Sequence, residues 1–200
     1  MITTALFHPS PGVRDKRTGY ALAGTTIAVA SLLTCLLIAS GSAASTLPIR
    51  FERISADDGL SQNSVLSVLQ SADGFMWFGT EDGLNRFDGY DFKIYSHDSA
   101  VSQSLADDYV VAVAEDEAGN LWIGTHAGGV SRWLRNADGF ETFQHDPQDP
   151  TSLPNDRVRT LMVDSENRLW VGTRDSGLAL FDPTTKTFVR YRHDEADPSS

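Results

Sequence analysis

Three stretches of this 200-residue chain share the motif Trp-x-Gly-Thr: Trp77-Phe78-Gly79-Thr80, Trp122-Ile123-Gly124-Thr125 and Trp170-Val171-Gly172-Thr173. The tryptophans are 45 and 48 residues apart, and a leucine lies seventeen residues before each of them. A valine follows each leucine by five residues, and an asparagine or aspartate follows it by three. These framework residues are Leu60, Asn63, Val65, Leu105, Asp108, Val110, Leu153, Asp156 and Val158. A period near 45 residues is typical of propeller blades and of helical arrays.

Each repeat predicts four short strands. The first is β-branched and apolar, as in residues 110–114, which predicts a fully buried inner strand. The second is residues 121–125 and its equivalents. The third strands are Leu84–Phe87, Val130–Trp133 and Leu178–Phe181, and the fourth are Phe92–Tyr95, Phe140–Phe143 and Phe188–Tyr191. Aligned turn positions hold Gly74, Gly119 and Asn167, then Gly83, Gly129 and Gly177. These residue types tolerate positive φ, which predicts tight hairpin turns.

No window shows apolar residues at helical spacing for the length of a helix, so the helical array is excluded. We therefore expect an all-β fold: a β-propeller with three four-stranded blades of an incomplete, seven-bladed ring, preceded by a signal peptide. The tryptophans are expected to pack between blades. The expected segments are a signal peptide at 1–44, a strand-bearing segment at 45–59, and blades at 60–104, 105–152 and 153–200. Within 45–59, Phe51–Ile54 is expected to be an outer fourth strand that closes the ring's last blade.

The N-terminus has the order of a secretory signal. Arg14, Lys16 and Arg17 precede an apolar run at residues 21–39, and small residues at 41–44 follow it. We expect cleavage after Ala43 or Ala44, with an uncleaved membrane anchor as the alternative. Either way the rest of the chain is expected to be exported to the periplasm. The only cysteine, Cys35, lies in the apolar run, so a cleaved chain would have no thiol for disulfides or metal ligation.

The charge balance limits the partners. The formal net charge is −11, and this charge argues against DNA, RNA or an anionic membrane surface as a binding partner. We expect contact with the membrane only through the signal peptide and through segments beyond residue 200. The repeat stops after Ser200, in the place where the next leucine is expected, so we also expect the chain to continue past it.

The residues resemble those of the two-component regulator propeller repeat family. The resemblance is carried by residues 59–65, Gly-Leu-Ser-Gln-Asn-Ser-Val, and by residues 73–90, which include Trp-Phe-Gly-Thr and Gly-Leu-Asn-Arg-Phe-Asp-Gly in order. It implies the extracytoplasmic sensor region of a bacterial hybrid histidine kinase or diguanylate cyclase receptor, anchored in the inner membrane. It also implies a homodimer in the full receptor and a small ligand, with an oligosaccharide as the analogy from relatives. It leaves open which ligand is sensed and which output domain follows.

Several residues suggest sites. The pairs His97-Asp98, His145-Asp146 and His193-Asp194 recur at 48-residue spacing. Each follows an outer strand, and outer edges of neighbouring blades are too far apart to share an ion. We therefore expect strand-exit turns in which the aspartate accepts backbone N–H bonds. Residues 116–122 resemble the acidic turn of sialidase-type propellers, which is structural. A sialidase also needs a cluster of arginines, for which Arg86, Arg132 and Arg168 are available, but turn and surface roles account for them equally well.

The sequence shows no Gly-rich phosphate loop, no Ser-His-Asp arrangement and no His-x-x-x-His pair. We therefore predict no catalytic, cofactor-binding or metal-binding residues in this segment and no cofactor, and the ligand-binding residues stay unassigned. Three hypotheses about function remain. The leading one is a ligand-sensing propeller of a membrane signalling receptor. The others are a secreted propeller enzyme acting on a glycoside and a protein interaction platform.

Overall fold

The computed structural model describes residues 50–194 and residue 197. Within them, strands form three antiparallel four-stranded sheets in simple up-and-down order. The first sheet contains β1 (Val65–Gln70), β2 (Met76–Thr80), β3 (Gly83–Phe87) and β4 (Phe92–Tyr95). The second contains β5 (Val110–Glu115), β6 (Leu121–Thr125), β7 (Val130–Leu134) and β8 (Gly139–Phe143). The third contains β9 (Val158–Val163), β10 (Leu169–Thr173), β11 (Leu178–Asp182) and β12 (Thr187–Tyr191). The prediction of three four-stranded blades is confirmed.

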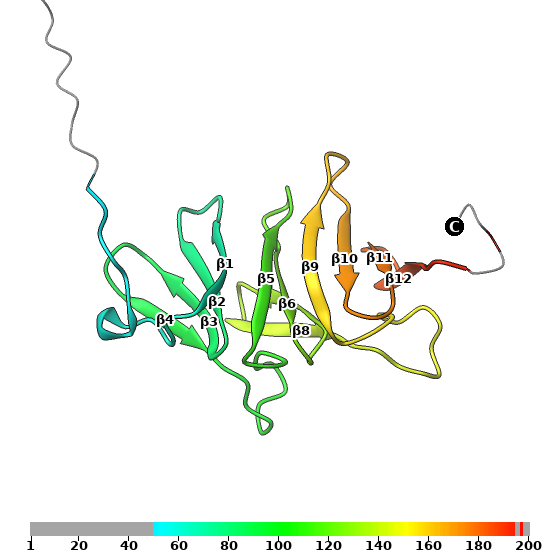
Figure 1. The fold of residues 1–200 in the computed structure, drawn as a ribbon, viewed down its shortest axis with the longest axis horizontal. Coiled ribbons are helices and arrows are strands. Elements are labelled where there is room, and N and C mark those ends of the chain that lie inside the picture. The colour runs from blue at the N-terminus through cyan, green and yellow to red at the C-terminus, as the bar shows by residue number, and fades with distance from the viewer. Residues whose placement is uncertain (1–49, 195–196, 198–200) are drawn as a thin grey trace, which may run out of the picture. The chain divides into compact units, whose positions relative to one another are not determined.

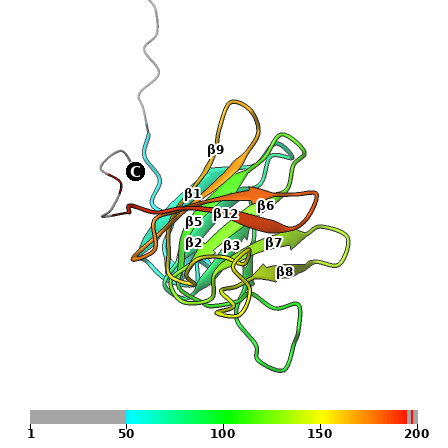
Figure 2. The same ribbon diagram turned by 90° about the vertical axis from the view of Figure 1, so that its right-hand side faces the viewer.

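The blades stand next to one another, with the inner strands β1, β5 and β9 side by side (Figure 1). They overlap when the row is viewed end-on (Figure 2). The hairpin turns have the expected backbone: φ is 93° at Gly74, 76° at Gly119 and 60° at Asn167. These left-handed values explain why glycine or asparagine stands there in each repeat.

The tryptophan, glycine and threonine of the Trp-x-Gly-Thr motif each have a structural role. Trp77 is fully buried and its ring lies 5.0 Å from that of Trp133 in the next blade. Trp122 lies 4.9 Å from Phe181 in the same way. Large rings therefore fill the space between blades, as the sequence predicted.

The framework valine of the next blade packs directly against the glycine of the motif. A Cβ added to Gly79 would stand 2.6 Å from Cγ1 of Val110, and one added to Gly124 would stand 2.7 Å from Cγ1 of Val158. Any side chain there would push neighbouring blades apart. The threonine closes the following turn, because Oγ1 of Thr80 donates to the carbonyl of Gly83 at 2.9 Å.

The residue six positions before each tryptophan holds the indole N–H. Trp122 Nε1 donates to Asp116 at 3.0 Å, Trp170 Nε1 donates to Asp164 at 2.7 Å, and Trp77 Nε1 donates to Ser71 at 3.0 Å. The acidic turn at residues 116–122 is therefore structural, as predicted. A buried indole N–H without an acceptor would cost free energy, which explains the recurrence.

The recurring histidines and the framework aspartates hydrogen-bond to one another's backbone or side chain in the loops between blades. The backbone N–H of His97 donates to the carboxylate of Asp108 at 2.6 Å, and its Nδ1 lies 2.8 Å from the carbonyl of Leu105. His145 repeats both contacts with Asp156 and Leu153. A carbonyl oxygen only accepts, so Nδ1 carries the proton in both histidines.

One sequence prediction needs correction. The inner strands are not fully buried: on β1, Val68 is 55% exposed and Leu66 is 43% exposed. The face of β1 that carries them has no blade against it within the described residues. Residues 51–54 pair with no strand among the described residues, and Phe51 is 93% exposed. The last blade of the ring, which they were predicted to complete, is not among those residues, so this stays a prediction. A one-turn 3-10 helix that was not predicted, Ala56–Asp58, precedes the first blade.

The predicted signal peptide at 1–44 lies outside the described residues. Among residues 50–194 and 197, no helix is long and apolar enough to cross a membrane.

Candidate functional site

The candidate site lies where the inner strands begin, beside the turns that join the second and third strands. In each repeat the framework leucine, aspartate or asparagine, valine and threonine stay fixed at this end. Two positions next to them change: the residue before the framework valine and the residue after the threonine of the motif. We call the six residues at these positions the variable edge. They are Ser64 and Glu81 in the first blade, Tyr109 and His126 in the second, and Arg157 and Arg174 in the third.

The two positions are neighbours in space. The N–H of His126 donates to the carbonyl of Tyr109 at 2.9 Å, and the N–H of Arg174 donates to the carbonyl of Arg157 at 2.8 Å. The backbone is therefore alike in both blades while the side chains differ. The fold does not require any one side chain at these places, and such freedom on loops carried by a rigid scaffold is typical of binding surfaces.

Side chains of the variable edge meet across the boundary between the first two blades. The phenol of Tyr109 donates to Glu81 at 3.2 Å, and Gln62 Nε2 donates to the other oxygen of that carboxylate at 3.2 Å. The ring of His126 lies 5.1 Å from that of Tyr109 at an interplanar angle of 55°. The carboxylate is thus held from two sides beside a pair of rings.

The electrostatics keep Tyr109 protonated. Its hydrogen bond to Glu81 raises the pKa of the phenol, and the positive charge of Arg159 opposes that rise. A phenol with a raised pKa is neutral at physiological pH. Tyr109 is therefore a hydrogen-bond donor to Glu81.

The third blade contributes arginines with weak or no acidic partners. The register of β9 shifts where Thr173 pairs with Val158 and Gly172 pairs with Thr160, so Arg159 is an extra, exposed residue. Arg157 reaches Asp175 only at 3.7 Å. Arg159 and Arg174 form no ion pair with any other described residue.

This arrangement suits a polar ligand. Glu81 and Gln62 offer acceptors and donors for hydroxyl groups, the two rings offer apolar faces, and the guanidinium groups match oxyanions. The sequence singled out none of these residues. The signal that could have found them was variation at a fixed register, read against the constant framework.

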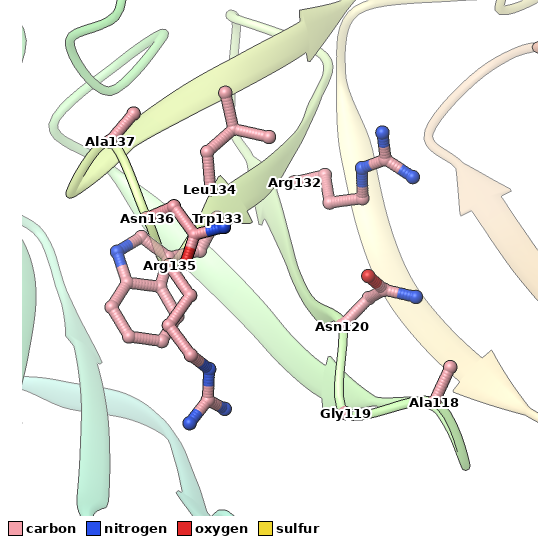
Figure 3. Close-up of a pocket in the computed structure, with 9 residues that line it drawn as sticks. All are labelled: Ala118, Gly119, Asn120, Arg132, Trp133, Leu134, Arg135, Asn136 and Ala137. Carbon is pink, nitrogen blue, oxygen red and sulfur yellow. The ribbon is translucent and has the colours of Figure 1, made fainter.

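A pocket of about 500 Å³ lies at the opposite end of the second blade, between the β5–β6 and β7–β8 turns (Figure 3). Its two arginines, Arg132 and Arg135, extend away from one another in different directions (Figure 3). Each already has a carboxylate: Arg135 pairs with Asp73 at 2.6 Å, and Arg132 pairs with Glu141. Two lining residues, Arg132 and Trp133, each have one buried side-chain nitrogen without a hydrogen-bond partner, Nε and Nε1. Because both guanidinium groups already pair with carboxylates, we take the variable edge as the candidate site.

The sequence candidates are placed elsewhere. Asp98 accepts the N–H of Ala100 and Asp146 accepts the N–H of Gln148, each at 2.9 Å or less, which confirms the strand-exit turns. His193-Asp194 follows β12 at the same register. Among the residues that the structure describes, no three His, Cys, Asp or Glu side chains gather as a metal-ligand set.

The candidate arginines stack on rings. The guanidinium of Arg86 lies 4.6 Å from the ring of Phe75, that of Arg132 lies 5.6 Å from Trp122, and that of Arg168 lies 5.6 Å from Trp170. Arg168 stands in a turn as expected. Arg86 and Arg132 are half-buried strand residues, so a turn or surface role is wrong for them, because stacking on aromatic rings draws their stems inward.

Comparison with known proteins agrees with this architecture. The family model described as "Two component regulator propeller" matches residues 59–82, 104–127 and 152–175. Over 56 residues the chain is 46% identical to Histidine kinase P4 of Formosa agariphila, a match that covers 28% of this chain and 4% of that protein.

Solved structures share the fold. The extracellular domain of the putative hybrid two component system BT3049 from B. thetaiotaomicron matches with a TM-score of 0.66 and 34% identity, over 70% of this chain and 20% of that one. Virginiamycin B lyase from Staphylococcus aureus matches with a TM-score of 0.50 and 16% identity, over 66% of this chain and 42% of that one. The second match shows the fold alone. The repeats, the blades they form and the similarity to a two-component system together show that this chain carries three repeats of the two component regulator propeller family.

Proposed function

We propose that this chain is part of the ligand-sensing propeller of a membrane signalling receptor and that it works outside the cytoplasm. The observation that carries the proposal is the 34% identity to an extracellular domain of a putative hybrid two-component system across 70% of this chain. The chain spans a fifth of that domain, so further propeller segments and an output domain, a histidine kinase or a diguanylate cyclase, belong to the proposed whole.

The blades supply a rigid platform for sensing. Buried tryptophans and the glycine–valine contacts fix neighbouring blades against one another. A ligand bound at the variable edge would therefore act on the relative arrangement of whole receptors, which we propose to be homodimers. Such a ligand shifts a two-state equilibrium only by its difference in affinity for the two states.

The test of sensing uses the full-length protein in membranes. We expect an oligosaccharide to change autophosphorylation if the output is a kinase, or cyclic di-GMP synthesis if it is a cyclase. Deleting residues 60–194 in frame should leave basal output measurable and abolish the response to the oligosaccharide. A response that persists after the deletion would contradict the proposal, and so would conversion of the oligosaccharide to a new product, which indicates an enzyme.

The test of export is a reporter fusion. Joining residues 1–60 to alkaline phosphatase, which is active only outside the cytoplasm, should give active enzyme with a new N-terminus near Ala44 or Ser45. A fusion without residues 14–39 is the matched control and should be inactive. Equal activity of the two fusions, or none in either, would remove the extracytoplasmic location.

A further inference from the structure

We infer that the variable edge, together with Arg159, binds an acidic saccharide, with the arginines of the third blade holding its carboxylate or sulfate group. This inference rests on the proposed sensing function and names the ligand class and the residues that select it.

The distribution of charge favours an anionic ligand at this place. The chain as a whole is acidic, with a formal net charge of −11. The first two blades hold few basic residues, which are Arg86, Lys93, Arg132 and Arg135, and each of these lies against a ring or a carboxylate. The third blade differs, because Arg157, Arg159 and Arg174 gather where β9 begins. An anion is repelled by most of this surface and attracted at one edge, which focuses binding there.

The arginines are available to a ligand. Arg157 touches Asp175 only at 3.7 Å, with side chains 42% and 58% exposed. Such an exposed pair is weak, so a ligand oxyanion can displace the aspartate at little cost. Arg159 and Arg174 have no ion-pair partner among the described residues. A guanidinium group binds a carboxylate or a sulfate through two parallel hydrogen bonds, whereas the ammonium group of a lysine acts as a point charge.

The neighbouring blades supply the contacts that a sugar needs. Glu81 and Gln62 form a fixed hydrogen-bonding pair 3.2 Å apart, and the rings of Tyr109 and His126 stand beside it. Carboxylate and amide groups hydrogen-bond ring hydroxyls, and aromatic faces cover the C–H side of a sugar. Tyr109 immediately precedes β5, and Arg159 lies in the neighbouring inner strand β9. One ligand can therefore span the hydroxyl-binding and oxyanion-binding parts.

Binding to the full-length protein, measured by isothermal titration calorimetry, tests the inference. The probes are oligosaccharides that carry uronate or sulfate groups, neutral oligosaccharides of the same length, and sodium acetate and sodium sulfate alone. We expect an acidic oligosaccharide to bind more tightly than its neutral counterpart and than either free anion. Its affinity should fall as salt rises from 0.05 M to 0.5 M, since exposed charges are screened.

Substitutions locate the site. Arg159→Gln should weaken acidic-oligosaccharide binding about tenfold, the loss of one charge-assisted contact. Tyr109→Phe keeps the ring but frees Glu81, and a smaller loss is expected. Arg168→Gln is the matched control, because Arg168 lies in the same blade at the opposite end of β9 and pairs with Asp164. The affinity of Arg168→Gln for the acidic oligosaccharide should equal that of the wild type. Circular dichroism of each variant checks that the fold is kept.

The outcomes separate this inference from the proposed function. Equal affinity for neutral and acidic sugars, binding of free anions alone, or an unchanged affinity in Arg159→Gln would overturn the inference. If a neutral sugar still switches the output, the sensing function stands without the acidic-ligand assignment. If no probe binds and no probe changes the output, both fail.

Discussion

The seam between the first and second blades and the seam between the second and third share one register but not one set of side chains. In both, a tryptophan packs on an aromatic ring of the next blade: Trp77 on Trp133, and Trp122 on Phe181. In both, a glycine seats a valine of the next blade. At the rim, by which we mean the exposed outer part of each seam, the ion pairs have opposite polarity. Lys93 pairs with Asp138 across the first seam, whereas Glu141 pairs with Lys186 at 2.5 Å across the second.

The reversal shows which contacts of a repeat stabilise a seam between any two blades and which contacts favour one particular neighbour. The apolar and glycine contacts are interchangeable between seams, so they hold any two blades together. The rim pairs are not: if the third blade packed on the first, Lys93 would face Lys186. Like charges placed opposite one another disfavour that arrangement. The buried centre therefore stabilises the row of blades, and the rim favours one order of blades.

The largest effect is expected from removing a tryptophan at the centre of a seam. Trp122→Ala should lower the free energy of opening of the second seam by about 3–5 kcal/mol, because a buried aromatic side chain is lost and a cavity remains. Hydrogen exchange of the β6 and β10 amides in the full-length protein measures this opening. Trp122→Phe is the milder control. Unchanged exchange in Trp122→Ala would show that the ring is not a packing element.

A smaller effect is expected from adding a side chain to the glycine against which the framework valine packs. Gly124→Ala should cost about 1–3 kcal/mol, the usual range for overpacking, since the new Cβ would stand 2.7 Å from Cγ1 of Val158. Combining it with Val158→Ala relieves the clash, so the double variant should lose less than the sum of the single losses. Additive losses, measured by urea denaturation, would mean that the two residues do not touch.

The framework of the fold was predictable because a repeat displays its own constraints. The fourth strand Phe92–Tyr95 was predicted at its observed bounds, and the six aligned turn positions that hold glycine or asparagine have positive φ as predicted. The positive φ of Asp138 and Lys186 was not predicted. The partner of each glycine was not predictable. Gly79 and Val110 lie 31 residues apart, and only the stacking of blades brings them together.

The candidate site was missed for a related reason. Tyr109, Glu81 and Arg159 come from three different blades, and no local motif connects them. The hydrogen bond between Tyr109 and Glu81, and the placement of Arg159 on the next inner strand, depend on the closeness of neighbouring inner strands. The exposure of Val68 also escaped the sequence, because an apolar run alone does not tell whether a neighbouring blade covers its face.

Reversing the rim charges tests the order of blades. Lys93→Glu or Asp138→Lys alone should destabilise the first seam by about 0.5–1 kcal/mol, the range for exposed ion pairs. The double variant Lys93→Glu with Asp138→Lys gives the first seam the polarity of the second and should recover most of the loss. Thermal unfolding of the four proteins at low salt measures the cycle. A double variant no more stable than the singles would show that the polarity of the pair is immaterial.

Acid should reveal the smallest effect, and it should act in the same direction on both seams. Hydrogen bonds from Lys93 and then Tyr95 outweigh partial burial and lower the pKa of Asp138. Burial would raise the pKa of Glu141, but Lys186 and Arg132 outweigh it and the pKa is lowered. A carboxyl with a lowered pKa in the folded protein stabilises it above the unfolded pKa, and that stability is lost as pH falls through the folded pKa. The unfolded values are 3.8 for Asp138 and 4.5 for Glu141.

Asp138→Asn and Glu141→Gln measure these contributions. Each variant should be less stable than the wild type at pH 7, by well under about 1 kcal/mol because the carboxylates are partly exposed. The difference should shrink below pH 4 and vanish once the wild-type carboxyl is protonated. The phenol of Tyr95, whose pKa burial and Asp138 raise, stays protonated over this range and adds no pH dependence. Urea denaturation between pH 2.5 and 7 gives the curves. A difference that does not change with pH for either variant would mean that the rim carboxylates act through packing, and the two seams would then differ in shape and not in charge.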